Sequence, residues 1–538
     1  MRNLFKYLLL LCTFKSYFAE KIVQTESGRI RGKKINALNN DVYAFLGIPY
    51  ATPPLGKLRF KAPQPVTKWE DIYNATVMSP ICMQDPVFPV LEWVPRERRY
   101  MSEDCLYLNI WVPVENKEKK PFSTMVWIHG GLFNTGSGNM DVHYGRILAS
   151  YGNVIVVTIN FRLGTFGFLN LDNEAAPGNM AFLDQVMALK WVHTNIESFG
   201  GDKEGITVFG TSSGAAAISL HLVSPLTKGL FKRAILQSGS CCHHHLEKKK
   251  NKNIKTSKRV AANVGCNNGT EDNKDIIDCL MQMDAVDIAA GEKQLLKTRN
   301  RLASYFTQLG EPFLPDDPVE YFDNGLIHDV EIMAGIAPEE GSMVLAYYSP
   351  EILNQDNPGF TVSTAKNILN TIYNFSKPKF DNVMEEYFGN VQEDDHTRIL
   401  ERTRDVIGDG IISCPVISLT EKLSVKNYTV YRYTFNHARI NAGYKKWEGV
   451  AHFAEIYFMF GLPFVYPEKY TPEEEEFSKQ VMQYWVSFAK TGKPSCPDQE
   501  EEWLPFTKEN RNVMKFDLGN IHRINEEPKK QCKLWKHT

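Results

Sequence analysis

The stretch Ile206-Thr-Val-Phe-Gly-Thr-Ser-Ser-Gly-Ala-Ala-Ala217 sets the interpretation of the whole chain. A β-branched run, Ile206–Phe209, leads into Gly210-Thr-Ser-Ser-Gly214, and a helix-forming run, Ala215–Leu222, follows. A sharp turn from strand to helix strains the central residue, and both flanking positions must be small for the turn to close. The pattern predicts that Ser212 is presented at the carboxyl edge of a sheet, above a helix N-terminus. The alternative is a glycine-rich structural turn.

Further strands are predicted upstream of this turn. Thr124–Ile128 and Val154–Ile159 are continuous apolar runs, which are typical of strands buried on both faces. Met180–Phe199 is typical of a helix. Strands alternating with helices predict an α/β fold with a large, mixed, mostly parallel central sheet and helices on both faces.

The N-terminus resembles a secretory signal. Arg2 and Lys6 precede a short apolar run, Tyr7–Phe14, and Lys15 interrupts it, which disfavours the alternative of an uncleaved anchor. We therefore expect a signal peptide over residues 1–19, a single domain over 20–538 and a secreted protein. The net charge of −2 gives no reason to expect nucleic acid or an anionic membrane as partner.

Glycosylation motifs and cysteines agree with export. Four N-x-S/T sequons begin at Asn74, Asn268, Asn374 and Asn427. Ten cysteines are present, and one, Cys12, lies in the signal. Nine is an odd number, so at least one thiol has no partner within the chain.

The segment 241–258, CCHHHLEKKKNKNIKTSK, is basic and poor in core residues. We expect a surface loop that leads into a helix. The histidines and cysteines could form a metal site, but their spacing matches no structural zinc pattern, so no metal is expected.

A serine nucleophile needs a base for its proton and donors for the developing oxyanion. The string His129-Gly-Gly-Leu-Phe133 directly follows the strand Thr124–Ile128. Its small residues let backbone N–H groups converge on one oxygen, and the N–H of Ser213 adds a donor.

These features come with longer strings that resemble the type B carboxylesterase and cholinesterase family, whose members have the α/β-hydrolase fold. The strings are Phe45-Leu-Gly-Ile-Pro-Tyr-Ala51, Ser102-Glu-Asp-Cys-Leu-Tyr-Leu-Asn-Ile110, Ala234-Ile-Leu-Gln-Ser-Gly-Ser240 and Tyr484-Trp-Val-Ser-Phe-Ala-Lys-Thr-Gly-Lys-Pro494. The resemblance runs from about Ile22 to the C-terminus. It implies a serine hydrolase that cleaves small-molecule carboxylic esters without a cofactor.

The resemblance also implies the roles of individual residues. Glu340, in Glu339-Glu-Gly-Ser342, takes the place of the family acid, and His452 takes the place of the family base. With Ser212 they would form the catalytic triad. Gly131, Leu132 and Ser213 would supply the oxyanion donors.

Three disulfides are implied in the same way: Cys82 with Cys105, Cys266 with Cys279, and Cys414 with Cys532. The resemblance leaves Cys241, Cys242 and Cys496 without an assigned partner.

The resemblance leaves the ester class open. Trp93 lies near the end of the loop between Cys82 and Cys105, where cholinesterases bind choline on a tryptophan face; it is either such a residue or a buried or rim tryptophan. Cholinesterases carry Glu at the position of Thr211, a third glycine at Leu132 and Gly at Phe453. These departures favour a general carboxylesterase over a cholinesterase.

A third hypothesis is a non-catalytic adhesion or binding protein, because the family includes cholinesterase-like recognition domains. Such domains typically lose the nucleophile or the histidine, whereas Ser212, Glu340 and His452 are all present. The departures at Leu132 and Phe453 keep this hypothesis open.

Overall fold

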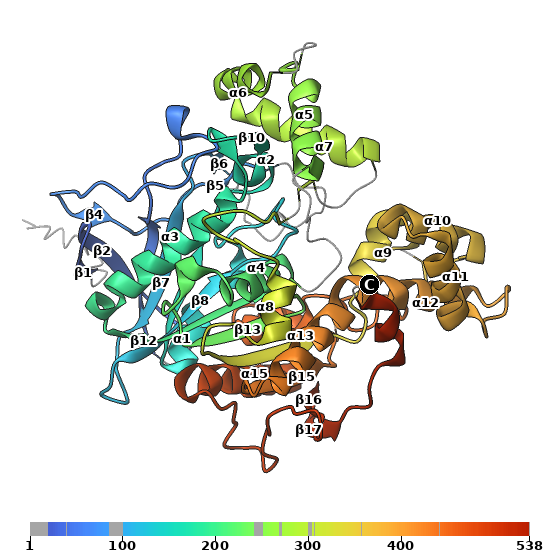
Figure 1. Ribbon diagram of the computed structural model, residues 1–538. Coiled ribbons are helices and arrows are strands. Elements are labelled where there is room, and N and C mark those ends of the chain that lie inside the picture. Colours follow the sequence, from blue (N-terminus) through green and yellow to red (C-terminus); the bar gives the residue numbers. More distant parts are fainter. Residues whose placement is uncertain are drawn as a thin grey trace, which may run out of the picture.

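The computed structural model describes residues 20–536 apart from 39, 85–99, 242–250, 268–271, 300–303, 306, 354, 357 and 441. Within this part of the chain, thirteen strands form one twisted sheet (Figure 1). Pairs from β9 through β8 to β16 are parallel, while both ends of the sheet are antiparallel. The predicted mixed, mostly parallel α/β sheet is therefore confirmed.

The strands have the following bounds. In sheet order they are β1 (Glu20–Thr25), β2 (Gly28–Ile35), β3 (Val42–Pro49), β7 (Tyr107–Pro113), β9 (Ile155–Ile159), β8 (Phe122–Ile128), β12 (Gly201–Thr211), β13 (Arg233–Gln237), β14 (Glu331–Ile336), β15 (Val430–Phe435), β16 (Asn512–Asp517) and β17 (Asn520–Asn525), with β4 (Tyr73–Asn74) beside β2. Two small ribbons pair β5 (Ile81–Cys82) with β6 (Met101–Ser102) and β10 (Asn170–Asn173) with β11 (Ala176–Pro177).

The α-helices also have defined bounds. They are α1 (Arg146–Gly152), α2 (Gly164–Phe168), α3 (Met180–Asn195), α4 (Ser213–His221), α5 (Asn251–Asn263), α6 (Asn273–Gln282), α7 (Ala285–Arg299), α8 (Pro318–Asn324), α9 (Ser342–Tyr348), α10 (Val362–Tyr373), α11 (Lys377–Phe388), α12 (His396–Gly408), α13 (Cys414–Val425), α14 (Ala454–Met459) and α15 (Pro472–Thr491).

The central strands carry long apolar stretches because both of their faces are covered. Along β8, Val126 and Ile128 join the core that includes α3, α4 and α13, while Met125 and Trp127 join the core that includes α1, α14 and α15. Side chains of a strand alternate between faces, so each residue of such a run meets a helix layer.

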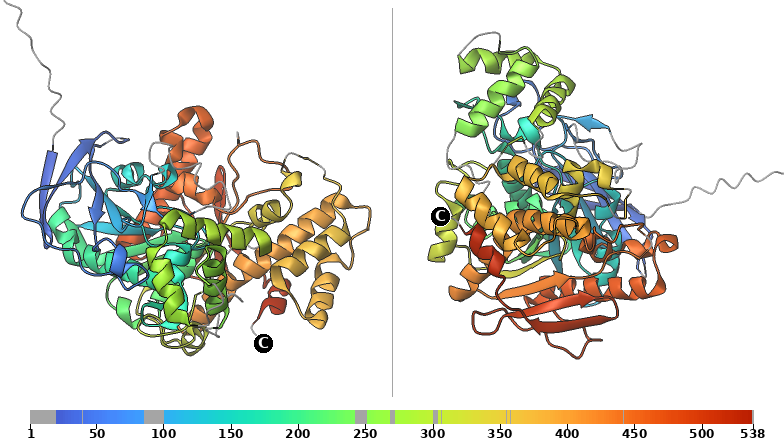
Figure 2. Two further views of the ribbon diagram at one scale, coloured as in Figure 1. Left: turned by 90° about the horizontal axis from the view of Figure 1, so that it is seen from above. Right: turned by 90° about the vertical axis from the view of Figure 1, so that its right-hand side faces the viewer.

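Two groups of helices lie outside these layers, α5–α7 and α9–α12 (Figures 1 and 2). Each has its own cluster of buried apolar side chains. Three disulfides close loops in the fold: Cys266–Cys279 joins the segment after α5 to α6, Cys414–Cys532 joins the start of α13 to the C-terminal segment, and Cys82–Cys105 closes a loop beside the sheet. These are the three pairs that the resemblance implies.

The structure agrees with the predicted strands and the predicted helix, and differs from the prediction for the segment 241–258. The runs predicted as strands lie in β8, β9 and β12, and the helix predicted over Met180–Phe199 is α3 followed by a 3-10 turn, Ile196–Phe199. The helix into which the segment 241–258 was predicted to lead is α5, but it begins earlier than predicted, at Asn251. Buried residues recur along that helix at Asn253, Thr256, Ser257, Val260 and Ala261, so it is amphipathic.

Several predictions lie outside the described residues: the signal over 1–19, Trp93, Cys242 and Asn268. The sequon asparagines Asn74, Asn374 and Asn427 are all exposed. No helix within the described ranges is long and apolar enough to cross a membrane.

Three of the buried histidines have a lowered pKa, and their protonation on unfolding makes stability depend on pH. Burial lowers the pKa of His129 to about 4 and those of His143 and His221 to about 3. Because an unfolded histidine titrates near pH ~6.5, the unfolded chain binds more protons between that pH and about 4. The contribution of these histidines to the free energy of unfolding should therefore decrease as the pH falls through this window, with up to about three extra protons bound on unfolding. Buried carboxyl groups with a raised pKa, such as Glu455, act in the opposite direction.

Denaturant unfolding followed by tryptophan fluorescence between pH 7.5 and 4.5 measures this slope. His221→Gln removes one titrating group, so the slope should become shallower by up to about one proton. A slope that is the same in His221→Gln and in wild type would contradict the expectation.

Candidate active site

Ser212 occupies the turn between β12 and α4 in a strained backbone conformation, with φ 56° and ψ −125°. Its backbone N–H donates to the carbonyl of Gln237 on the neighbouring β13 at 2.8 Å. A Cβ atom on Gly210 or Gly214 would lie 2.5 or 2.1 Å from the carbonyl oxygen of Ile128. Both glycines are therefore required for the turn to pack against β8.

The loop after β8 lies beside this turn. At Gly131 the backbone has φ +118°, and a Cβ atom there would lie 2.0 Å from the carbonyl oxygen of Thr135. Leu132 and Phe133 also have positive φ, 57° and 59°. Two consecutive non-glycine residues in the left-handed region cost energy, and such strain persists where surrounding packing enforces it. Phe133 is held by the rings of Phe168 and Phe182.

Glu340 and His452 form a buried hydrogen-bonded pair. The Nδ1 atom of His452 lies 2.5 Å from Oε2 of Glu340, and both side chains are almost completely buried. The other carboxylate oxygen of Glu340 accepts the backbone N–H of Ala337 at 2.7 Å. A carboxylate on Nδ1 fixes the ring orientation and leaves Nε2 to exchange a proton.

The neighbouring Glu339 ties the two loops that carry this pair. Its carboxylate accepts the backbone N–H of Val450 at 2.8 Å, and its own N–H donates to the carbonyl of Val450 at 3.3 Å. Gly449 has φ +58° and passes against the Glu339 side chain. Burial raises the pKa of Glu339, although the bond from Val450 opposes that shift.

Ser212 and the histidine loop meet at Gly130. A Cβ atom at Gly130 would lie 3.0 Å from Cβ of Ser212 and 3.4 Å from the ring of Phe453. The Phe453 and His452 rings have centroids 4.1 Å apart. The Ser212 hydroxyl has no hydrogen-bond partner among the residues that the structure describes. Catalytic hydrogen bonds often form with good geometry only when a substrate is bound.

Two buried polar residues near the site have roles that the sequence did not reveal. The Gln237 side chain donates to Glu455 at 3.0 Å and accepts from the indole N–H of Trp485 at 3.2 Å. Burial raises the pKa of Glu455, while the Gln237 bond opposes the shift. Gln237 thus links the Ser212 turn to the helix after His452. Gln237 and Glu455 lie in segments that resemble the family, but no local sequence pattern indicates that they contact each other.

Thr211, the residue before Ser212, is 1% exposed. Its hydroxyl has no hydrogen-bond partner among the described residues. At this position the site therefore presents a neutral side chain, where a carboxylate would attract a cation.

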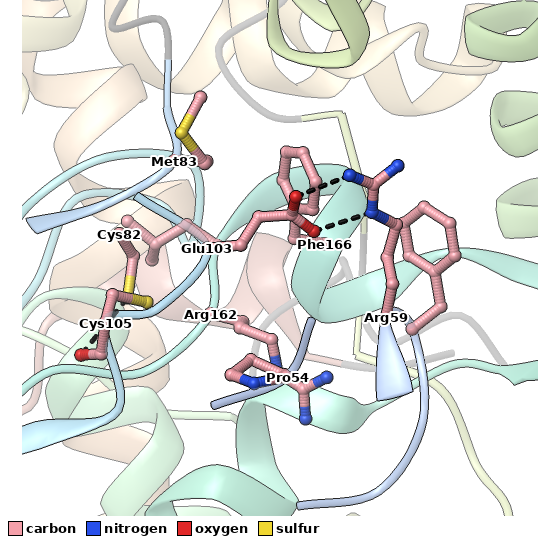
Figure 3. Close-up of a pocket in the computed structure, with 10 residues that line it drawn as sticks. Pro54, Arg59, Cys82, Met83, Glu103, Cys105, Arg162 and Phe166 are labelled. Carbon is pink, nitrogen blue, oxygen red and sulfur yellow. Dashed lines mark hydrogen bonds and ion pairs between the residues drawn. A yellow bond between two sulfur atoms is a disulfide. The ribbon is translucent and has the colours of Figure 1, made fainter. Parts of the chain in front are cut away.

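The base of the loop that carries Trp93 is anchored beside a small cavity (Figure 3). Arg59 donates to both carboxylate oxygens of Glu103, through Nε at 2.6 Å and Nη2 at 2.5 Å. Nη1 of Arg59 donates to the carbonyls of Leu280 and Met283 near the end of α6. The cavity, of about 10 Å³, also borders Cys82–Cys105 and has room for one water molecule. This anchor fixes the loop at its disulfide end.

Comparisons with known proteins agree with this arrangement. A model of the carboxylesterase family matches residues 19–535. A cholinesterase from Mus musculus is 37% identical over 547 residues, which cover 98% of this chain and 89% of that protein. An acetylcholinesterase from Bungarus fasciatus is 35% identical over 529 residues, which cover 96% of this chain and 86% of that protein.

Proposed function

The chain belongs to the carboxylesterase family and is a carboxylic ester hydrolase, and from this premise we propose that it is secreted and acts through a Ser212–His452–Glu340 triad. The observation that carries the triad is the buried 2.5 Å contact between His452 and Glu340. The strained Ser212 turn and the Gly130 contact with both Ser212 and Phe453 support it.

The proposed reaction has two halves. Oγ of Ser212 bonds to the ester carbonyl carbon while Nε2 of His452 takes the hydroxyl proton. The bond to the alcohol oxygen then breaks, and His452 delivers that proton to the leaving alcohol. Water repeats the sequence on the acyl-enzyme, releasing the carboxylic acid and restoring Ser212. The N–H groups of Gly131, Leu132 and Ser213 stabilise the oxyanion, and Glu340 stabilises the charged imidazole.

We propose that uncharged esters are the preferred substrates. Thr211 places no negative charge beside the nucleophile, and its hydroxyl is buried. A cationic choline group therefore gains no Coulomb attraction at this position. The second candidate is a cholinesterase, favoured by relatives of that name at 35–37% identity. A role for Trp93 in binding choline belongs to this second candidate.

A non-catalytic binding role is the third candidate. It remains because Leu132 and Phe453 replace family glycines, and both have positive φ. The presence of Ser212, Glu340 and His452 argues against it.

Secretion and processing complete the proposal. Three disulfides agree with an oxidising compartment, and the exposed Asn74, Asn374 and Asn427 are accessible to glycosylation. Removal of residues 1–19 would leave residues 20–538 as a single domain.

Replacement of the nucleophile should abolish both turnover and labelling. Ser212→Ala should lower the hydrolysis rate of a neutral ester by about 10⁴-fold or more, because no acyl-enzyme can form. Mass spectrometry after treatment with an organophosphate should find one adduct, on the Ser212 peptide. Ser363→Ala, an exposed serine on α10, is the matched control and should behave as wild type. An adduct of equal yield on Ser212→Ala would refute the mechanism.

Two adjacent glutamates provide a test of the acid. Glu340→Gln should lower kcat by about 10⁴-fold, because an amide cannot stabilise the imidazolium or its tautomer as a carboxylate does. Glu339→Gln keeps an acceptor for Val450 N–H and should lose less than about tenfold. Steady-state kinetics on both variants decide the roles. Comparable losses in the two would contradict the assignment.

The ester class can be tested with one pair of substrates. Wild type should hydrolyse 3,3-dimethylbutyl thioacetate at least as well as acetylthiocholine, judged by kcat/KM. Thr211→Glu should raise the ratio in favour of the cationic ester by about tenfold, and the neutral Thr211→Gln should not. A wild-type preference for acetylthiocholine would favour the cholinesterase candidate instead.

A further inference from the structure

A second cavity, of about 420 Å³, opens on the surface and shares no lining residue with the catalytic groups. Lys33 on β2 and Leu46 on β3 line one side, and Thr76–Met78 line another. The rest comes from Asp141 and Tyr144, which precede α1, from Arg146 at its start, and from Val465–Tyr466, beyond α14. Its volume lies within the roughly 300–1,000 Å³ of small-molecule sites.

The lining carries a positive excess, because two cations, Lys33 and Arg146, face one carboxylate, Asp141. Within the described chain, Lys33 and Arg146 form no ion pair. Glu20 lies opposite Lys33 in the β1–β2 pair, but its carboxylate lies 3.2 Å from Arg31.

Arg146 has unused hydrogen-bonding capacity. Its Nε atom is buried and has no partner among the described residues, and Nη1 makes one long bond, 3.4 Å, to the carbonyl of Asn36. A guanidinium is suited to carboxylate recognition because its donors match the two oxygens.

The remaining lining is apolar and aromatic. The rings of Tyr144 and Tyr466 lie in the wall, and Leu46, Met78 and Val465 add aliphatic surface. Val77 is 74% exposed, which places it at the rim. An apolar body can rest on these side chains while an anionic head meets the cations.

We propose that this cavity binds a small amphipathic anion with an alkyl or aryl body and a carboxylate head. The site is independent of the proposed catalytic mechanism, because its lining contains none of Ser212, His452 and Glu340. Arg146 is the main partner of the carboxylate, and Lys33 adds a second positive charge.

Isothermal titration of the full chain with sodium decanoate tests the proposal. Arg146→Gln should weaken the decanoate affinity by about tenfold, the loss typical of one charged hydrogen bond. The exposed rim permits two opposite substitutions without disturbing the core: Val77→Asp should weaken binding and Val77→Lys should tighten it, each by about threefold. Lys274→Gln, an exposed lysine on α6, is the charge-matched control and should bind as wild type.

Two further results would overturn the proposal. Unchanged decanoate affinity in both Arg146→Gln and Val77→Asp would exclude the cavity. Decyltrimethylammonium, which has the same chain with the opposite charge, should bind more weakly than decanoate. If Arg146→Gln and Val77→Asp weakened the binding of decyltrimethylammonium as they weaken that of decanoate, the site would not select anions.

Discussion

The site depends on one steric constraint, the close approach of the Ser212 turn to its two neighbours. On one side Gly214 passes so near the carbonyl of Ile128 that a methyl group would lie 2.1 Å from it. On the other, a methyl group on Gly239 would lie 2.0 Å from the carbonyl of Ser212. The turn is thus clamped between the segments after β8 and β13. Parallel strands place their carboxyl ends at one edge, and the close packing of the turn brings the loops of the candidate site together there.

The core of the sheet could be predicted because its signal is local. A strand segment buried on both faces is largely apolar, and Thr124–Ile128 in β8, β9 and Ile206–Phe209 in β12 follow this rule. The start of α5 could not be predicted in this way, because part of its inward face is polar. Asn253 and Ser257 are buried, and the Ser257 hydroxyl accepts the backbone N–H of Asn170. Such contacts across the fold leave no apolar period in the sequence.

The candidate site also contains some residues with a local sequence signature and others without one. The Ser212 turn has a local signature of glycines at fixed spacing. Glu340 and His452 are 112 residues apart, and Gln237 and Glu455 are 218 apart. Only family strings pointed to the first pair, and the second had no signal. Glu339 was visible in its string, but its bonds to Val450 became evident only once both loops were in place.

The disulfide Cys414–Cys532 closes a covalent ring that contains one member of the proposed triad and not the other two. The ring encloses β15, His452, α14 and α15, whereas Ser212 and Glu340 lie on the linear part of the chain. A protease that nicked the ring once would leave both fragments joined through sulfur, so the proposed base would stay tethered to the rest of the molecule. Only reduction of the disulfide would release the cleaved fragment. Such a cleavage would therefore change the apparent size of the denatured protein only under reducing conditions.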